Sequence, residues 1–115
     1  MVINIFMGEN KMQKYLILQP NQGAISDGVA YEISRSNEDV IKDAWDNGHY
    51  RKAGYLLAKN LNDAFMIGNV QHEKVEKIDK FYSISCGDII IDCDFKSAHL
   101  VAPLGFKCIR INCNI

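Results

Sequence analysis

Short apolar runs separated by polar turns mark the N-terminal part of the chain. Residues 14–19, KYLILQ, form one such run, and PNQG follows with a composition typical of turns. Residues 28–35, GVAYEISR, alternate instead, with Val29, Tyr31 and Ile33 on one side of an extended chain. We therefore predict two strands that pair as a hairpin across the loop at residues 20–28.

The hydrophobic period changes to a helical one after residue 35. Four apolar residues recur at helical spacing: Val40, Ile41, Ala44 and Trp45. Ser36 or Asn37 can cap the start of this segment, and Gly48 suits the position just after its end. The pattern predicts a short amphipathic helix.

Residues 50–60, YRKAGYLLAKN, fit either a helix or a strand. Ala53, Tyr55 and Leu57 alternate, and Gly54 lowers helix propensity by about 1 kcal/mol, so we predict a strand. Residues 60–69, NLNDAFMIGN, then predict a second helix with Asn60 or Asn62 as its cap. The charge-rich residues 70–81 either extend this helix or form a solvated loop.

The last third contains three short β-rich runs, GDIIID, AHLVAP and FKCIRI. The connections between them are short enough for an antiparallel three-strand meander over residues 88–111. Together the patterns predict an α+β fold in a single small domain over residues 1–115. A mostly antiparallel sheet of five or six strands would carry one or two helices covering one face. Met7 and Met12 offer alternative starts, so residues 1–11 are interpreted as an upstream-start extension or a disordered terminus.

Composition narrows the classes of function. The chain of 115 residues is 48% apolar, and 13 basic residues nearly balance 14 acidic ones. Proteins that bind duplex DNA usually show a basic stripe, so no direct duplex DNA binding is expected, and a DNA mimic would need a large negative excess. No apolar run approaches the ~18–20 residues of a membrane span, and the N-terminus lacks a signal-peptide pattern. We expect a cytoplasmic protein with reduced thiols and no membrane contact.

Cys86, within the stretch SISCGDIIID, is the candidate nucleophile. A nucleophilic cysteine needs a cation, a histidine or a helix N-terminus to form its thiolate, whereas here an aspartate follows two residues later. A glycine able to adopt φ > 0 and an aspartate able to accept backbone N–H groups favour a turn that leads into a strand, so we predict no catalytic residue. The residues assigned to structural turns are Ser83, Ser85, Gly87, Asp88 and Gly105.

The cysteine spacing does not indicate a metal centre. The four cysteines at positions 86, 93, 108 and 113 form no Cys-x-x-Cys pair, so we predict no zinc site and no cofactor. Asp88, Asp92 and Asp94 alternate along one predicted strand. We interpret them as a solvated strand edge that discourages edge-to-edge pairing, in preference to a Mg²⁺ site.

A candidate contact surface follows the first predicted helix. The loop DNGHYR brings together residue types that are enriched at interface hot spots. Trp45 lies on the apolar helical stripe, which favours the core, but it adjoins this loop. The residues predicted to bind a partner are Trp45, His49, Tyr50, Arg51 and Tyr82.

The segments YSISCGDIIID, AHLVAP and LGF resemble the signature of the YodL-like family of small bacterial, phage and plasmid proteins. Residues 83–90 take the signature positions, Gly105 and Phe106 close it, and YRKAGYLLAKNLNDAFMIGN resembles the strand and helix that precede it. The resemblance covers residues 50–111, with Tyr82 in place of the usual arginine. It implies an α+β domain without established enzymatic activity, encoded by mobile elements and, for some members, tied to host morphology factors.

These observations predict a non-catalytic accessory protein of a phage or other mobile element. Such a protein would bind and modulate a host protein or complex in the bacterial cytoplasm, for example as an anti-CRISPR or antirestriction inhibitor. Two alternatives stay open: a regulator of host cell-shape or division machinery, and a small-molecule-binding protein or enzyme that uses Cys86.

Overall fold

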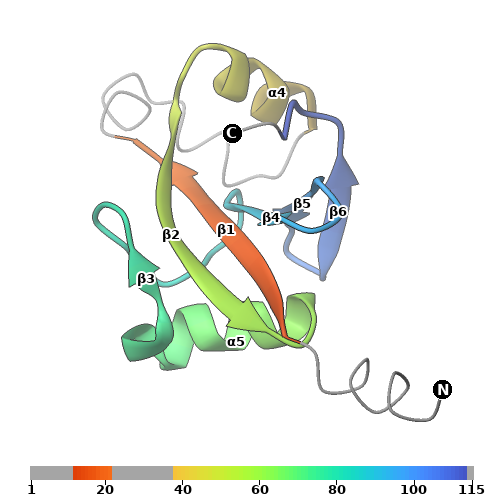
Figure 1. Ribbon diagram of the computed structural model, residues 1–115. Helices are drawn as coiled ribbons and strands as arrows, with labels where there is room; N and C mark the ends of the chain where they lie inside the picture. The colour runs from red at the N-terminus through yellow and green to blue at the C-terminus, as the bar shows by residue number, and fades with distance from the viewer. Residues whose placement is uncertain (1–11, 22–37, 114–115) are drawn as a thin grey trace, which may run out of the picture.

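The computed structural model describes residues 12–21 and 38–113. The expected strand at residues 28–35, the caps Ser36 and Asn37, and the segment 1–11 lie outside the described residues. The elements follow the chain as shown in Figure 1. They are β1 (Gln13–Pro20), α4 (Glu38–Asp46), β2 (Tyr50–Ala58), α5 (Leu61–Val70), a 3₁₀ helix (His72–Lys74), β3 (Glu76–Lys77), β4 (Ile89–Asp92), β5 (Ser97–Val101) and β6 (Phe106–Ile109).

The described strands form one antiparallel sheet in the order β3-β2-β1-β4-β5-β6. This arrangement confirms the α+β fold, and β4, β5 and β6 form the meander expected at the C-terminal end of the chain. β1 lies in the middle of the sheet, where it pairs with β2 on one side and with β4 on the other. Its run of apolar residues therefore reflects burial on both faces of the sheet.

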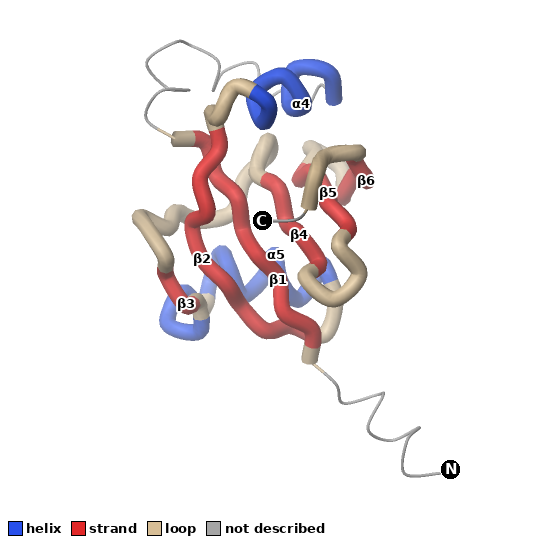
Figure 2. The backbone as a smooth tube through the Cα atoms, turned by 45° about the horizontal axis from the view of Figure 1, so that its top comes forward, coloured by secondary structure: helices blue, strands red, loops and turns tan. Residues whose placement is uncertain are grey.

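Each face of the sheet has its own apolar cluster. Leu16 and Leu18 of β1 pack on one face with Ile41 and Ala44 of α4. Tyr15 and Ile17 point to the other face, where α5 contributes Ala64 and Ile67. The expectation that the helices share one face is therefore wrong: successive residues of the central strands are apolar, so both faces need a cover. Figures 1 and 2 show α4 at one end of the sheet and α5 packed near the other end.

The segment after α5 follows neither of the two predicted courses. α5 itself begins as expected, because the side chain of Asn60 accepts a hydrogen bond from the Asp63 N–H. The chain then forms the 3₁₀ helix and returns along β2 as the two-residue strand β3. A Cβ at Gly54 would lie 2.9 Å from the Glu76 carbonyl oxygen, so glycine permits this close approach of β3 to β2.

Candidate functional site

The turn that contains Cys86 closes one end of the sheet. The carboxyl of Asp88 accepts from the Ser85 N–H at 3.1 Å and from Nε2 of Gln19 at 3.1 Å. Gln19 also exchanges two hydrogen bonds with the backbone of Tyr82, at 2.8 Å and 3.1 Å. Gly87 has a φ of 94°, a left-handed conformation that favours glycine. A buried glutamine and a buried aspartate thus fasten this turn to β1.

Burial has an electrostatic consequence at this end. Asp88 is only 4% exposed. Desolvation raises the pKa of its carboxyl to about 7, against the opposing effects of the Ser85 and Gln19 hydrogen bonds and of the Arg51 charge. The prediction of a solvated aspartate edge is therefore wrong for two of its three residues, because β4 is a central strand and Asp88 and Asp92 at its two ends are buried, while Asp94 is exposed.

Three of the residues predicted to bind a partner lie beside this turn. Tyr50 is buried, and its hydroxyl donates to the Gly87 carbonyl at 2.5 Å, so its side chain supports the turn and is not a surface contact. Arg51 donates to the Lys80 carbonyl, and its guanidinium lies 5.8 Å from the centroid of the Tyr82 ring. Tyr82 is 60% exposed. Arg51 and Tyr82 therefore form a surface pair, and their contact role stays a prediction.

The remaining residues predicted from the sequence are divided between core and loop. Trp45 is half-buried, packs against the cluster around α4 and lies 6.4 Å from Tyr50, measured between ring centroids. His49 is half-buried, and its Nδ1 has no hydrogen-bond partner among the described residues. The hydroxyl of Ser83 lies 3.3 Å from Nε2 of His72, away from the turn that it was expected to support. Gly105, with a φ of 84°, forms the connection between β5 and β6.

Cys86 is half-buried at the start of the Gly87 turn, and all four cysteines are free thiols. In the part of the chain that the structure describes, no histidine is hydrogen-bonded to Cys86: His72 contacts Ser83, and His99 contacts Ser97. Within the same residues, no three metal-ligating side chains are grouped so that they could hold a metal ion. None of the described helices is long and apolar enough to cross a membrane.

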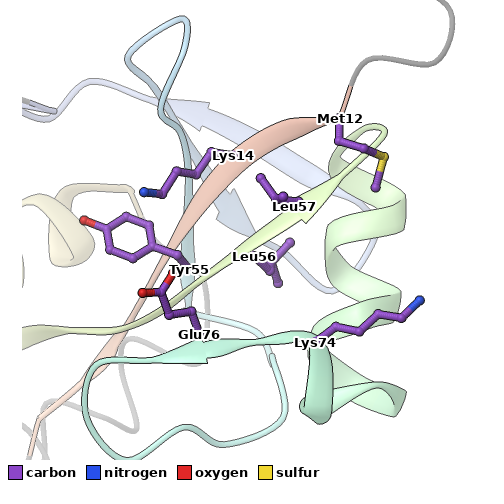
Figure 3. A pocket seen from close by; sticks show the side chains of 7 residues that line it. All are labelled: Met12, Lys14, Tyr55, Leu56, Leu57, Lys74 and Glu76. Carbon is purple, nitrogen blue, oxygen red and sulfur yellow. The ribbon is translucent and has the colours of Figure 1, made fainter.

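The opposite end of β2 presents an open strand edge. β3 pairs only with Gly54 and Tyr55, so the outer edge of residues 56–58 has no strand partner in the described ranges. A groove of about 550 Å³ runs along this edge (Figure 3). Its lining residues are Met12, Lys14, Tyr55, Leu56, Leu57, Lys74 and Glu76. Leu57 is 57% exposed and Met12 is 41% exposed, so apolar side chains face solvent beside unpaired backbone.

The charged side chains of this groove are Lys14, Lys74 and Glu76. Nζ of Lys14 lies 4.1 Å from the centroid of the Tyr55 ring, in a cation–π contact that holds both side chains on the groove wall. Lys74 comes from the 3₁₀ helix, and Glu76 of β3 is the one acidic residue in the lining. Two lysines against one glutamate give the lining a net positive charge.

Sequence reasoning missed this groove. The alternation at residues 50–60 placed Leu57 on the same side as Ala53 and Tyr55, where an apolar side chain is expected to be buried. The open edge depends on how short β3 is, and the charge-rich residues 70–81 carried no strand signal. The available clue was Leu57, a leucine in a segment that contains lysines. The sequence does not show that it is exposed, because exposure depends on which elements pack above a strand.

No family model, curated protein or solved structure matches the chain. The resemblance of residues 50–111 to the YodL-like signature therefore stays a prediction from those residues.

Proposed function

We propose that this protein is a non-catalytic binding protein that accepts an extended segment of a partner protein as an added strand at the open edge of β2. The observation that carries the proposal is the coincidence of unpaired strand edge and apolar groove at residues 56–58. In strand addition, main-chain hydrogen bonds supply affinity and side-chain pockets supply specificity. Exposed sheet edges bind other chains readily, and proteins usually block those that have no partner.

The chemistry of the groove specifies the partner segment. Leu57 and Met12 offer contact to one apolar side chain, and Lys14 and Lys74 offer contact to carboxylates. The expected ligand is therefore an extended peptide with an apolar residue flanked by Asp or Glu. Charge complementarity of this kind speeds association and excludes basic competitors.

The wider role that we propose is that of a phage or mobile-element accessory protein whose partner is a host protein. Its support is the resemblance of residues 50–111 and the near balance of charge, 13 basic against 14 acidic residues. That balance favours blocking a host defence protein by contact over imitation of DNA. Expression of the protein alone, with cell width as the readout, separates this role from the alternative of a cell-shape regulator.

A peptide selection tests the binding mode directly. The full chain is immobilised, random displayed peptides are selected on it, and the selected peptides are then measured against the Leu57→Glu variant. We expect acidic, strand-compatible peptides that lose at least tenfold in affinity on Leu57→Glu and on Lys14→Glu. The matched control is Leu104→Glu, because Leu104 is also an exposed leucine and lies in the connection between β5 and β6.

The proposal fails if the selected peptides bind the Leu57→Glu variant as tightly as the unmodified chain. It also fails if Leu104→Glu weakens binding as much as Leu57→Glu, because a general loss of surface hydrophobicity would then explain the result.

A further inference from the structure

A second hollow lies at the same end of the sheet but on the face that carries α5. Its volume is about 510 Å³, and it is bounded by the first residues of α5, by β1 and by the hairpin between β4 and β5. The lining residues that matter for its chemistry are Tyr15, Asp92, Phe95, Ser97, His99 and Phe106.

A row of polar side chains crosses three strands beneath this hollow. Tyr15 of β1 pairs with Asp92 of β4, which in turn pairs with Ser97 of β5. Directly opposite residues of neighbouring strands point to the same face of a sheet. Two positions further along the strands, Ile17 and Ile90 are apolar, and Ile67 of α5 belongs to the same cluster. The polar row therefore lies at the border of the apolar cluster, to which the ring of Tyr15 also belongs.

Asp92 is the anionic group of this row. It is only 7% exposed. Its Oδ1 accepts from the backbone N–H groups of Asp94 at 3.0 Å and Phe95 at 3.2 Å, which shapes the hairpin turn. Oδ2 has no hydrogen-bond partner within the described part of the chain. Asp92 lines the hollow, so this oxygen is free to accept a hydrogen bond from a cationic ligand bound there.

The neighbouring oxygens and charges favour the same kind of ligand. The Tyr15 hydroxyl donates to Oε1 of Gln13 at 2.8 Å, which leaves its own lone pairs available. Burial, followed by the charges of Asp92, Asp94 and Asp63, raises the pKa of the Tyr15 hydroxyl, so carboxylates surround this point.

The lining contains two further titratable groups, His99 and Lys59, and Lys59 balances Asp92 in formal charge. Oγ of Ser97 lies 2.9 Å from Nε2 of His99, and burial lowers the pKa of that imidazole against the effect of Asp92, which favours its neutral form. Lys59 is the one lysine in the lining, and its side chain is exposed to solvent.

We propose that this hollow binds a primary ammonium group on an aliphatic stem, with Oδ2 of Asp92 as its counter-ion. The oxygens of Tyr15 and Ser97 accept further hydrogen bonds from the ammonium, and the rings of Phe95 and Phe106 flank the stem. Aromatic faces also attract cations. Such a group belongs either to a free polyamine or to the lysine side chain of a peptide, and the experiment separates these sources.

Titration of the full chain with spermidine and with Nα-acetyl-lysine methylamide tests the proposal, with 1,5-pentanediol as the uncharged analogue. Calorimetry gives the affinity, and amide chemical shifts give the location. We expect shifts at Tyr15, at the 92–97 hairpin and at His99 with an amine and none with the diol. Tighter binding of spermidine identifies a free polyamine as the source, and tighter binding of the lysine derivative identifies a peptide.

Asp92→Asn should weaken amine binding at least tenfold, because an asparagine Oδ1 preserves the hairpin turn while the charge is lost. Asp46→Asn is the matched control, since it makes the same charge change at the end of α4 and should leave the affinity unchanged. Phe95→Ala is a second variant that leaves the fold intact, because Phe95 is 72% exposed, and should weaken binding about threefold through the lost ring contact.

Equal binding of the diol, absence of shifts in this row, or unchanged affinity in both Asp92→Asn and Phe95→Ala overturns the proposal. Leu57→Glu on the opposite groove should leave amine binding unchanged, so failure here and failure of the strand-addition proposal are separate results.

Discussion

The two ends of the sheet use the same residue types in different ways. At one end Gln19 and Asp88 are buried together, and their oxygens and nitrogens are bonded to each other and to the backbone of Tyr82 and Ser85. At the other end Gln13 and Asp92 are also neighbours of a tyrosine, but Asp92 lines a hollow and its Oδ2 accepts no hydrogen bond from the described residues. We call these the closed end and the open end.

We infer from this difference that one end of the sheet stabilises the fold and that the other end binds ligands. Gln19 and Asp88 at the closed end are hydrogen-bonded within the protein and fix the turn, whereas Nδ1 of His49 at the same end has no partner among the described residues. α4 lies over this end (Figures 1 and 2). In our two proposals, polar and apolar groups at the open end bind ligands on both faces of the sheet. The turn at residues 85–88 therefore stabilises the fold, and we propose that binding occurs at the open end.

The largest expected effect is a difference in the free energy of unfolding between variants of two glutamines in β1. Gln19→Ala removes three hydrogen bonds and leaves Asp88 and the Tyr82 backbone with lost partners, so the free energy of unfolding should fall by about 2–4 kcal/mol. Gln13→Ala removes one half-exposed contact to the Tyr15 hydroxyl and should lower it by about 1 kcal/mol or less. Urea denaturation of both variants checks the comparison; equal losses would mean that the ends do not differ.

Asp88 gives the closed end a pH dependence. The folded chain holds this proton up to a pKa of about 7, against an ordinary value of 3.8, so the stabilising contribution is full below pH 3.8 and is lost as the pH rises through 7. Asn at position 88 stays neutral at every pH, so the variant does not lose this contribution. Between pH 4 and pH 8 the free energy of unfolding of the unmodified chain should therefore fall by on the order of 2–3 kcal/mol relative to that of Asp88→Asn. Denaturation curves at the two pH values measure it. A difference that does not change with pH would refute the buried, proton-holding aspartate.

Gly54→Ala tests the geometry of the open edge. The added Cβ would lie 2.9 Å from both the Glu76 carbonyl oxygen and Cγ1 of Val75, so β3 must move away from β2. We expect a loss of about 1–3 kcal/mol in thermal or chemical unfolding, with faster amide exchange at Glu76 and Lys77. Unchanged stability together with unchanged exchange would show that β3 does not pack on β2 as described.

The smallest expected effect concerns Tyr82, the contact residue predicted from the sequence. Its ring is largely exposed and contributes a single cation–π contact to Arg51, so Tyr82→Ala should change the free energy of unfolding by about 1 kcal/mol or less. The same denaturation assay measures the change. A loss above about 2 kcal/mol would assign the Tyr82 ring to the packing of the closed end.

Local patterns predicted most of the fold. The periodicity of residues 14–19, 50–60 and 88–111 predicted β1, β2 and the meander of β4, β5 and β6. Asn60 caps α5, as its position suggested. The features that the sequence did not predict depend on contacts between residues far apart in the chain. That Gln19 reaches Asp88, and that Asp92 is buried in a central strand, follow from strand order, which spacing along the chain does not specify.

The open end illustrates the same limit for function. Leu57 and Met12 are ordinary apolar residues in sequence, and only the two-residue length of β3 exposes the edge beside them. Arg51 and Tyr82 were identified by residue type, and the structure places them together at the closed end. Residue type alone pointed to Arg51 and Tyr82 but did not show that the edge of residues 56–58 has no strand partner in the described ranges.

Site-specific photo-crosslinking in bacterial cells tests the central claim most directly, that binding occurs at the open end. A benzophenone amino acid is introduced at position 57, at position 82 and, as a control, at position 104, all of which carry exposed side chains. We expect a discrete protein adduct at position 57 that Lys14→Glu diminishes, with none at 82 or 104. An adduct at position 82 without one at 57 would contradict it and would assign the contact surface to Arg51 and Tyr82.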